Sequence, residues 1–196
     1  MTKKAMLICL AVTAIVALTA GVALAKTING TAKNDSLDGT PNADRISGRG
    51  GDDYIVGWGG PDEIVGGSGK DRIWGRNGDD TAFGLAGNDS MVGESGHDRL
   101  VGGDGEDKLV GDEMIGGDGD DRIGDAIWGQ PISGTLLASG GGGNDTINVL
   151  EHHFDVADGI STPDRVVCGP GPDDRVKANA DDTVAEDCET VEIVEQ

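Results

Sequence analysis

Aspartate recurs every nine residues over much of this chain of 196 residues. The series is unbroken at nine positions: Asp35, Asp44, Asp53, Asp62, Asp71, Asp80, Asp89, Asp98 and Asp107. Carboxylates are hard oxygen ligands, and calcium accepts about six to eight oxygens in flexible geometry. A periodic set of carboxylates therefore indicates one kind of metal site that is repeated along the chain.

Each of these aspartates closes a glycine-rich segment. A glycine lies five residues before every one of them, at Gly30, Gly39, Gly48, Gly57, Gly66, Gly75, Gly84, Gly93 and Gly102. A second glycine lies two residues before the aspartate in the units from Gly51 through Gly105. Glycine allows tight turns, and such turns direct backbone carbonyl oxygens toward a metal. Calcium is favoured because magnesium needs stricter octahedral geometry and softer metals prefer thiolate or imidazole ligands.

A simpler alternative is that the aspartates only occupy turns, where the side chain bonds to its own backbone. A stacked row of carboxylates argues against this alternative. Like charges a few ångströms apart repel each other unless a cation lies between them.

The residues between the turns predict short strands. Two residues after each aspartate stands an apolar residue: Leu37, Ile46, Ile55, Ile64, Ile73, Ala82, Met91, Leu100 or Leu109. A single unit cannot bury that side chain, but stacked strands about 4.8 Å apart align such residues into a core. The pattern predicts an all-β solenoid with a turn of six residues and a strand of three residues in each unit.

Three segments match G-G-x-G-x-D-x-U-x, namely Gly66–Trp74, Gly102–Val110 and Gly116–Gly124. They resemble the RTX, or haemolysin-type, calcium-binding repeat. The resemblance runs from Asn29 to Val110 and resumes at Ile115–Ile123 and Ser139–Ile147, which adds Asp121 and Asp145 to the metal candidates. It implies a right-handed parallel β-roll, with two nonapeptides in each coil and several Ca2+ ions between turns stacked on the same side.

Departures from the repeat define the expected boundaries. Lys33 and Asn42 replace the fourth glycine in the first two units, so we interpret these units as a capping start that is less suited to metal. Residues 111–115 and 124–138 interrupt the pattern, and we expect bulging loops there. The second position of the unit varies widely and looks tolerant. The roll is predicted to span residues 26–147.

The N-terminus is typical of a secretory signal. Lys3 and Lys4 precede an apolar run, and Ala23-Leu24-Ala25 predicts cleavage after Ala25, which would also remove Cys9. A membrane anchor is the alternative, but no basic flank follows the run. Cleavage removes two lysines and leaves a formal net charge of -23, which argues against nucleic acid and anionic membranes as partners. We expect a secreted protein, with retention at the cell surface left open.

Residues 148–196 are expected to continue the solenoid in degenerate form and to end in a cap. The pattern of an acidic residue followed two positions later by valine returns at Asp164, Asp174, Asp182 and Glu189. An exported chain with Cys168 and Cys188 suggests a disulfide, and a metal site on two thiolates is the alternative. The surrounding residues resemble the ending of secreted, actinobacterial-type calcium-binding proteins, which implies a disulfide-tied cap. His152 and His153 offer a weaker transition-metal alternative.

These features favour a calcium-binding structural or interaction protein that folds on binding Ca2+. We predict no enzyme activity, because the sequence has no H-E-x-x-H and no G-x-S-x-G motif. The alternatives are a surface adhesin and a calcium-dependent accessory module of a secreted enzyme system. The apolar residues that end the units, such as Val56, Trp74 and Phe83, either form a binding surface or reflect β-propensity.

Overall fold

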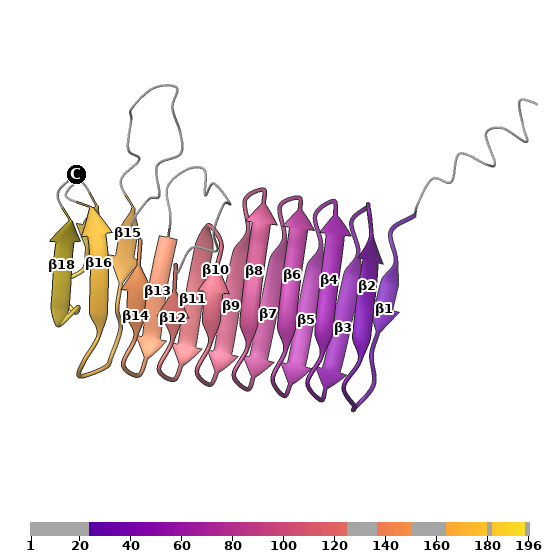
Figure 1. Cartoon of the computed structure of the whole chain (residues 1–196), viewed down its shortest axis with the longest axis horizontal. Helices are drawn as coiled ribbons and strands as arrows, with labels where there is room; N and C mark the ends of the chain where they lie inside the picture. The colour runs from indigo at the N-terminus through magenta and orange to yellow at the C-terminus, as the bar shows by residue number, and fades with distance from the viewer. Residues whose placement is uncertain (1–23, 125–136, 150–163, 180–181, 195–196) are drawn as a thin grey trace, which may run out of the picture.

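The computed structural model describes residues 24–124, 137–149, 164–179 and 182–194. These residues form a parallel β-solenoid of about 8 turns, with no helix in the described part of the chain. Two sheets of nine strands face each other, one made of the odd-numbered strands and the other of the even-numbered strands (Figure 1). The chain alternates between the sheets, so each coil contributes one strand to each.

The odd-numbered sheet contains β1 (Thr27–Asn29), β3 (Arg45–Gly50), β5 (Glu63–Ser68), β7 (Thr81–Ala86), β9 (Arg99–Asp104), β11 (Glu113–Asp118), β13 (Leu137–Gly142), β15 (Arg165–Val167) and β17 (Thr183–Val184). The even-numbered sheet contains β2 (Ser36–Thr40), β4 (Tyr54–Gly59), β6 (Arg72–Asn77), β8 (Ser90–Ser95), β10 (Lys108–Val110), β12 (Arg122–Ile123), β14 (Thr146–Asn148), β16 (Arg175–Asn179) and β18 (Thr190–Val194).

The register follows the repeat. Ile46 pairs with Ile64 in one sheet, and Ile55 pairs with Ile73 in the other, so partners lie two nonapeptides apart. All four side chains are buried and belong to one core that fills the space between the sheets. The structure confirms the predicted β-roll architecture, because stacking turns each unit's single apolar residue into part of a continuous core.

Residues 111–115 form a shortened unit instead of the expected bulging loop. Only Gly111 and Asp112 separate β10 from β11, and Met114 takes its place in the core. Arg99 pairs with Glu113, which keeps the register although four residues of the turn are missing. The interruption expected at residues 124–138 lies largely outside the described residues; its last two residues, Leu137 and Ala138, begin β13.

The C-terminal strands continue both sheets, and the predicted disulfide joins Cys168 to Cys188. Val191 pairs with the buried Val176, yet it is 42% exposed in the last strand. The described residues therefore leave the final layer of the core partly open. The apolar run of the expected signal and both histidines of the weaker metal alternative lie outside the described residues. Within the described residues, we find no helix long and apolar enough to span a membrane.

Candidate calcium-binding rows

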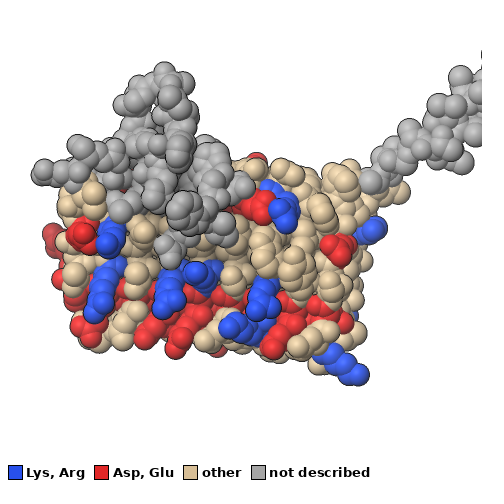
Figure 2. All heavy atoms as spheres, in the orientation of Figure 1, with Lys and Arg blue, Asp and Glu red and all other residues tan. Residues whose placement is uncertain are grey.

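The turns gather the acidic residues along the two edges of the roll. The turns that lead into the even-numbered strands hold what we call the long row: Asp35, Asp53, Asp71, Asp89, Asp107, Asp121, Asp145, Asp174 and Glu189. The turns that lead into the odd-numbered strands hold the short row: Asp44, Asp62, Asp80, Asp98 and Asp112 and, nearer the C-terminus, Asp164 and Asp182. Acidic side chains form a band along the lower edge of the molecule, where the long row lies (Figures 1 and 2).

One carboxylate oxygen of most aspartates in the two rows is used to link successive coils. The backbone N–H of Asp71 donates to Oδ1 of Asp89 at 2.8 Å, and the N–H of Asp89 donates to Oδ1 of Asp107 at 2.8 Å. The same bond repeats along the long row and ends where the N–H of Asp174 donates to Oε2 of Glu189 at 3.0 Å. The periodic spacing of the aspartates is therefore a structural requirement as well as a potential source of ligands.

The other carboxylate oxygen has no hydrogen-bond partner in many coils. Among the described residues, the buried Oδ2 atoms without a partner belong to Asp53, Asp62, Asp71, Asp80, Asp89, Asp98, Asp107, Asp121, Asp145 and Asp174. A buried oxygen without a partner costs about 1–3 kcal/mol, and more when it is charged. A repeated set of such atoms is evidence for a ligand rather than for a local packing fault.

The first glycine of the turn makes room beside that oxygen. A Cβ added to Gly84 would lie within 3 Å of both Oδ2 of Asp89 and the carbonyl oxygen of Gly102 in the next coil. The bare Cα thus borders a space that is lined by a carboxylate oxygen from one coil and a carbonyl oxygen from the next. Hard oxygen donors of these two kinds suit Ca2+, so the residues present fit this metal.

Burial makes the carboxylates difficult to ionise without a cation. It raises the pKa of Asp80, Asp89 and Asp121 to about 7. The pKa values of Asp62, Asp98, Asp107 and Asp145 rise to about 6 for the same reason. Backbone hydrogen bonds oppose these increases, and neighbouring carboxylates add to them less than burial does. Loss of hydration, more than the expected repulsion between aspartates, therefore creates the demand for positive charge.

The first coil differs from the others. Thr40 donates its backbone N–H to Oδ2 of Asp44 at 2.5 Å and its hydroxyl to Oδ1 at 3.1 Å. Thr31 donates its N–H and its hydroxyl to Oδ2 of Asp35 at 2.6 and 2.8 Å. Both carboxylates stand in their rows, but threonine occupies the oxygens that would otherwise be available to a metal.

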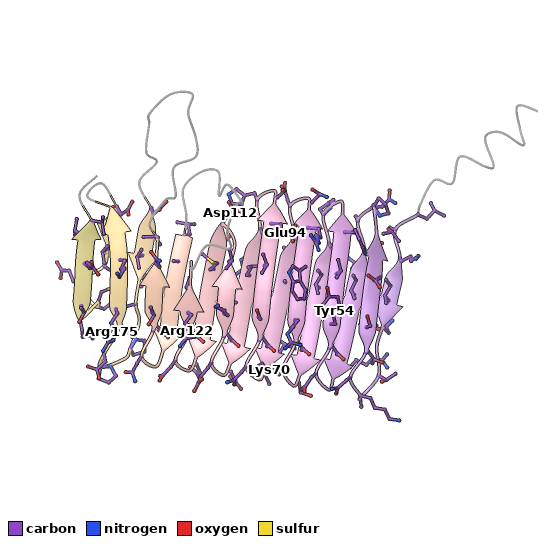
Figure 3. All side chains as sticks on the ribbon, viewed as in Figure 1. Tyr54, Lys70, Glu94, Asp112, Arg122 and Arg175 are labelled. Carbon is purple, nitrogen blue, oxygen red and sulfur yellow. A yellow bond between two sulfur atoms is a disulfide. The ribbon has the colours of Figure 1, made fainter. Side chains whose placement is uncertain are left out.

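Three further acidic residues share the buried position and were not among the nine-residue series. Asp112 and Asp164 are buried, and Asp174 is buried with an unpartnered Oδ2. Asp112 lies at the upper edge of the roll (Figure 3), where its Oδ2 accepts from the N–H of Asp98 at 2.9 Å. The sequence signal for it is the apolar Met114 two residues later, which matches the repeat once the strict spacing is relaxed.

The second position of the turn is more constrained than its sequence variety suggested. Arg49, Trp58, Arg76, Leu85 and Glu94 all occupy it with φ between 76° and 86°. Side chains other than glycine adopt this left-handed region at a cost of about 1–2 kcal/mol. Glycine is favoured there for the backbone conformation, and the other residues are accommodated under strain.

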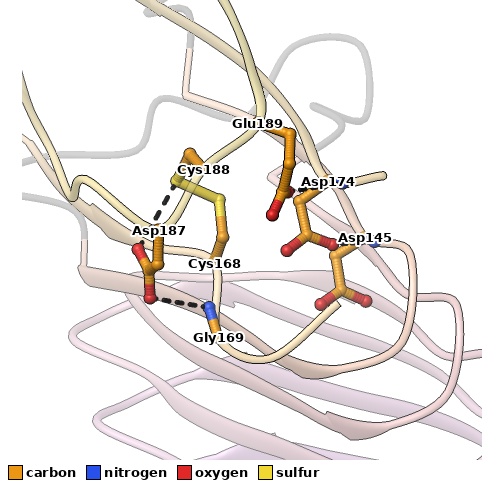
Figure 4. The surroundings of a disulfide bond; sticks show 7 residues. All are labelled: Asp145, Cys168, Gly169, Asp174, Asp187, Cys188 and Glu189. Atoms are coloured by element: carbon orange, nitrogen blue, oxygen red, sulfur yellow. Dashed lines mark hydrogen bonds between the residues drawn. A yellow bond between two sulfur atoms is a disulfide. The ribbon is translucent and has the colours of Figure 1, made fainter. Parts of the chain in front are cut away.

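The last complete turn of the long row carries a covalent link. Cys168 takes the first position of the turn, where earlier coils have glycine, and its disulfide reaches Cys188 in the following turn (Figure 4). Nearby, Oδ2 of Asp187 accepts from the N–H of Gly169 at 3.0 Å. The disulfide therefore joins consecutive turns at the end of the row, where the glycine-lined space gives way to a cysteine side chain.

Across the described residues, no three Asp, Glu, His or Cys side chains converge as a cluster, because each turn buries only one carboxylate and places backbone oxygens beside it. The model for the RTX calcium-binding nonapeptide repeat matches four times, at residues 29–64, 59–91, 83–113 and 138–149. No individual curated protein matches the chain. RTX nonapeptide repeats bind Ca2+, and the matched segments include most residues of both rows. The chain therefore belongs to the proteins that carry the RTX calcium-binding nonapeptide repeat.

Proposed function

We propose that this protein is an exported module that folds when it binds Ca2+ and then serves as a structural or interaction unit. The observation that carries the proposal is the repeated buried Oδ2 atom without a hydrogen-bond partner, beside a glycine whose missing Cβ leaves an oxygen-lined space. Bound calcium would supply the positive charge that keeps these carboxylates ionised.

Calcium binding is coupled to folding because the core is thin. Each full coil adds two inward-facing apolar side chains, such as Ile55 and Ile64, to the core between the sheets. Ordering the backbone costs about 1–2 kcal/mol for each residue, and the expected mature charge of -23 opposes compaction. Metal binding free energy then contributes directly to folding free energy.

The two edges offer unequal numbers of candidate sites. Unpartnered Oδ2 atoms occur at seven aspartates of the long row, from Asp53 to Asp174, and at Asp62, Asp80 and Asp98 of the short row. The short row then reaches the two-residue turn of Gly111 and Asp112. This turn is too short to include the glycine that stands five residues before the aspartate in a full unit. The proposed consequence is that more Ca2+ ions bind along the long row than along the short row.

Export fits this role. Sites in extracellular modules commonly bind calcium with dissociation constants of about 0.1 to 1 mM, a concentration range available outside cells. The proposed signal at residues 1–25 would deliver the chain to that environment before it folds. A chain that lacks calcium in the cytosol would remain expanded until then.

The test is a count of bound metal on residues 26–196 after refolding. We expect native mass spectrometry to show several Ca2+ ions at about 2 mM calcium, which exceeds the dissociation constants of about 0.1 to 1 mM that are common for extracellular modules. Magnesium at the same concentration should not replace them, because it retains its water and needs stricter geometry. A folded protein that binds no calcium, or equal amounts of both metals, would refute the proposal.

A further inference from the structure

The short row begins with a backbone nitrogen whose chemistry depends on how the chain is processed. In the later coils, Oδ1 of Asp62 accepts from the N–H of Asp44 at 2.7 Å, and Oδ1 of Asp80 accepts from the N–H of Asp62 at 2.8 Å. The first bond of the series joins Oδ1 of Asp44 to the nitrogen of Lys26 at 2.6 Å. Lys26 thus stands where an aspartate would stand if another coil preceded it.

The expected cleavage site lies directly at this nitrogen. The sequence predicts hydrolysis between Ala25 and Lys26. In the structure, Leu24, Ala25 and Lys26 are exposed and precede the first strand, which begins at Thr27. The bond is therefore exposed in the folded roll as well as in the unfolded chain. Cleavage there would make the first residue of the mature chain the first residue of the short row.

We propose that this cleavage creates a cationic cap on the short row: the new α-ammonium group of Lys26 pairs with the carboxylate of Asp44. An export peptidase adds water across the Ala25–Lys26 peptide bond, so that Ala25 gains a carboxylate and the nitrogen of Lys26 becomes an amine that is protonated at neutral pH. The hydrogen bond from a neutral amide to the carboxylate becomes a bond between an ammonium and a carboxylate, which adds the attraction between two opposite charges at the same oxygen.

The surroundings of Asp44 are consistent with a cap that contains no metal. Asp44 is 3% exposed, and Thr40 already donates to both of its oxygens. Its Oδ2 is not among the unpartnered atoms, in contrast to the Oδ2 atoms of Asp62, Asp80 and Asp98 further along the row. Asp44 remains a buried carboxylate, and the α-ammonium is the nearest positive charge that processing would supply. The proposal relies on export of the chain, whereas the number of calcium ions does not enter it.

Two measurements test the cap. First, the full chain is exported from a bacterial host, and the mass of the released protein is determined. We expect it to begin at Lys26; a different first residue would overturn the proposal. Second, a chain that begins at Lys26 is compared with the same chain carrying Gly-Ser before Lys26, which restores an amide at this position. In saturating calcium, the extension should lower the melting temperature by about 2 to 4 °C.

Two variants show whether the effect passes through Asp44. Asp44→Asn removes the charge that the ammonium would meet, so the Gly-Ser extension should then change the melting temperature by less than about 1 °C. Asp35→Asn is the matched control, because Asp35 begins the long row with the same kind of threonine partner but without the N-terminal nitrogen. It should keep the full sensitivity to the extension. Equal melting temperatures for the exact and extended chains, or an unchanged effect in Asp44→Asn, would overturn the proposal.

Discussion

Replacement of Asp89 by asparagine should have opposite effects with and without calcium. Asp89 is 2% exposed, and its Oδ1 accepts the N–H of Asp71. Asparagine can keep this bond, while its amide group takes the place of the unpartnered Oδ2 and can donate to a carbonyl oxygen. The substitution therefore removes the charge and changes the shape of the turn very little.

The magnitude follows from the pKa. Burial raises the pKa of Asp89 from 3.8 to about 7, which corresponds to about 4 kcal/mol of penalty on the ionised form. In metal-free solution above neutral pH, Asp89→Asn removes much of that penalty and should increase the folded population. In saturating calcium, it removes a ligand, and we expect a loss of about 3 kcal/mol, or a melting temperature lower by about 8 °C.

The assay combines thermal melting with a count of bound calcium. Asp89→Asn should lose at least one ion. Asp112→Asn is the control, because Asp112 is buried in the same kind of hydrogen-bonded row but has no unpartnered Oδ2. Its calcium count should not change. If both variants retain every ion, or if Asp89→Asn destabilises the protein equally with and without calcium, the reasoning about the oxygen-lined space is refuted.

Three further predictions concern pH, backbone strain and the disulfide. Burial raises the pKa of Asp80 and Asp121 to about 7. Between about pH 4 and pH 7, the metal-free folded chain therefore holds protons that the unfolded chain has released. The stability of the metal-free folded state should rise as the pH falls from 7 toward 4. In calcium, the same protonation removes ligands and stability should fall. This would be contradicted by a circular dichroism spectrum in chelator with no more β structure at pH 4.5 than at pH 7.5, or by a calcium-bound protein that melts no lower at pH 4.5 than at pH 7.5. Leu85→Gly should raise the stability measured in a thermal melt by about 1 kcal/mol. Leu85 has φ of 84° and is 50% exposed, so relief of backbone strain outweighs the small loss of apolar burial. A large decrease in stability would show that the contacts of the leucine side chain matter more than the strain. Replacing Cys168 and Cys188 by serine should lower the free energy of unfolding by about 3 kcal/mol. Amide hydrogen exchange should become faster in β16 and β18, while β6 stays protected. A uniform loss of protection would show instead that the disulfide supports the whole roll.

The repeat contained most of the information about the fold. A single apolar residue after each aspartate specified the core, because only stacking can bury Ile55 or Ile73, and the nine-residue period placed those residues in two sheets. The unit at residues 111–115 was harder to predict, since its turn lacks four residues and a strict period treats it as an interruption. Met114 keeps the register because pairing between strands tolerates a shorter turn, provided that the inward position is maintained.

The candidate site was predictable at the level of residue type but less so at the level of individual oxygens. The sequence identified Asp35 and Asp44 together with Asp53 and Asp62, since all four share one spacing. The missing glycines at Lys33 and Asn42 already marked the first two units as less suited to metal. The structure adds a different reason, because the hydroxyl groups of Thr31 and Thr40 bond to the first two carboxylates. The strain at Trp58 was likewise hidden, since a variable position in sequence gives no indication of a positive φ.

The most direct test of calcium-coupled folding is a far-ultraviolet circular dichroism titration of residues 26–196 at pH 7.5, starting in excess chelator. We predict the spectrum of an unordered chain in chelator and a cooperative change to β structure as free calcium reaches about 0.1 to 1 mM. A complete β spectrum that persists in chelator would contradict the central claim, because the buried carboxylates would then be accommodated without any bound cation.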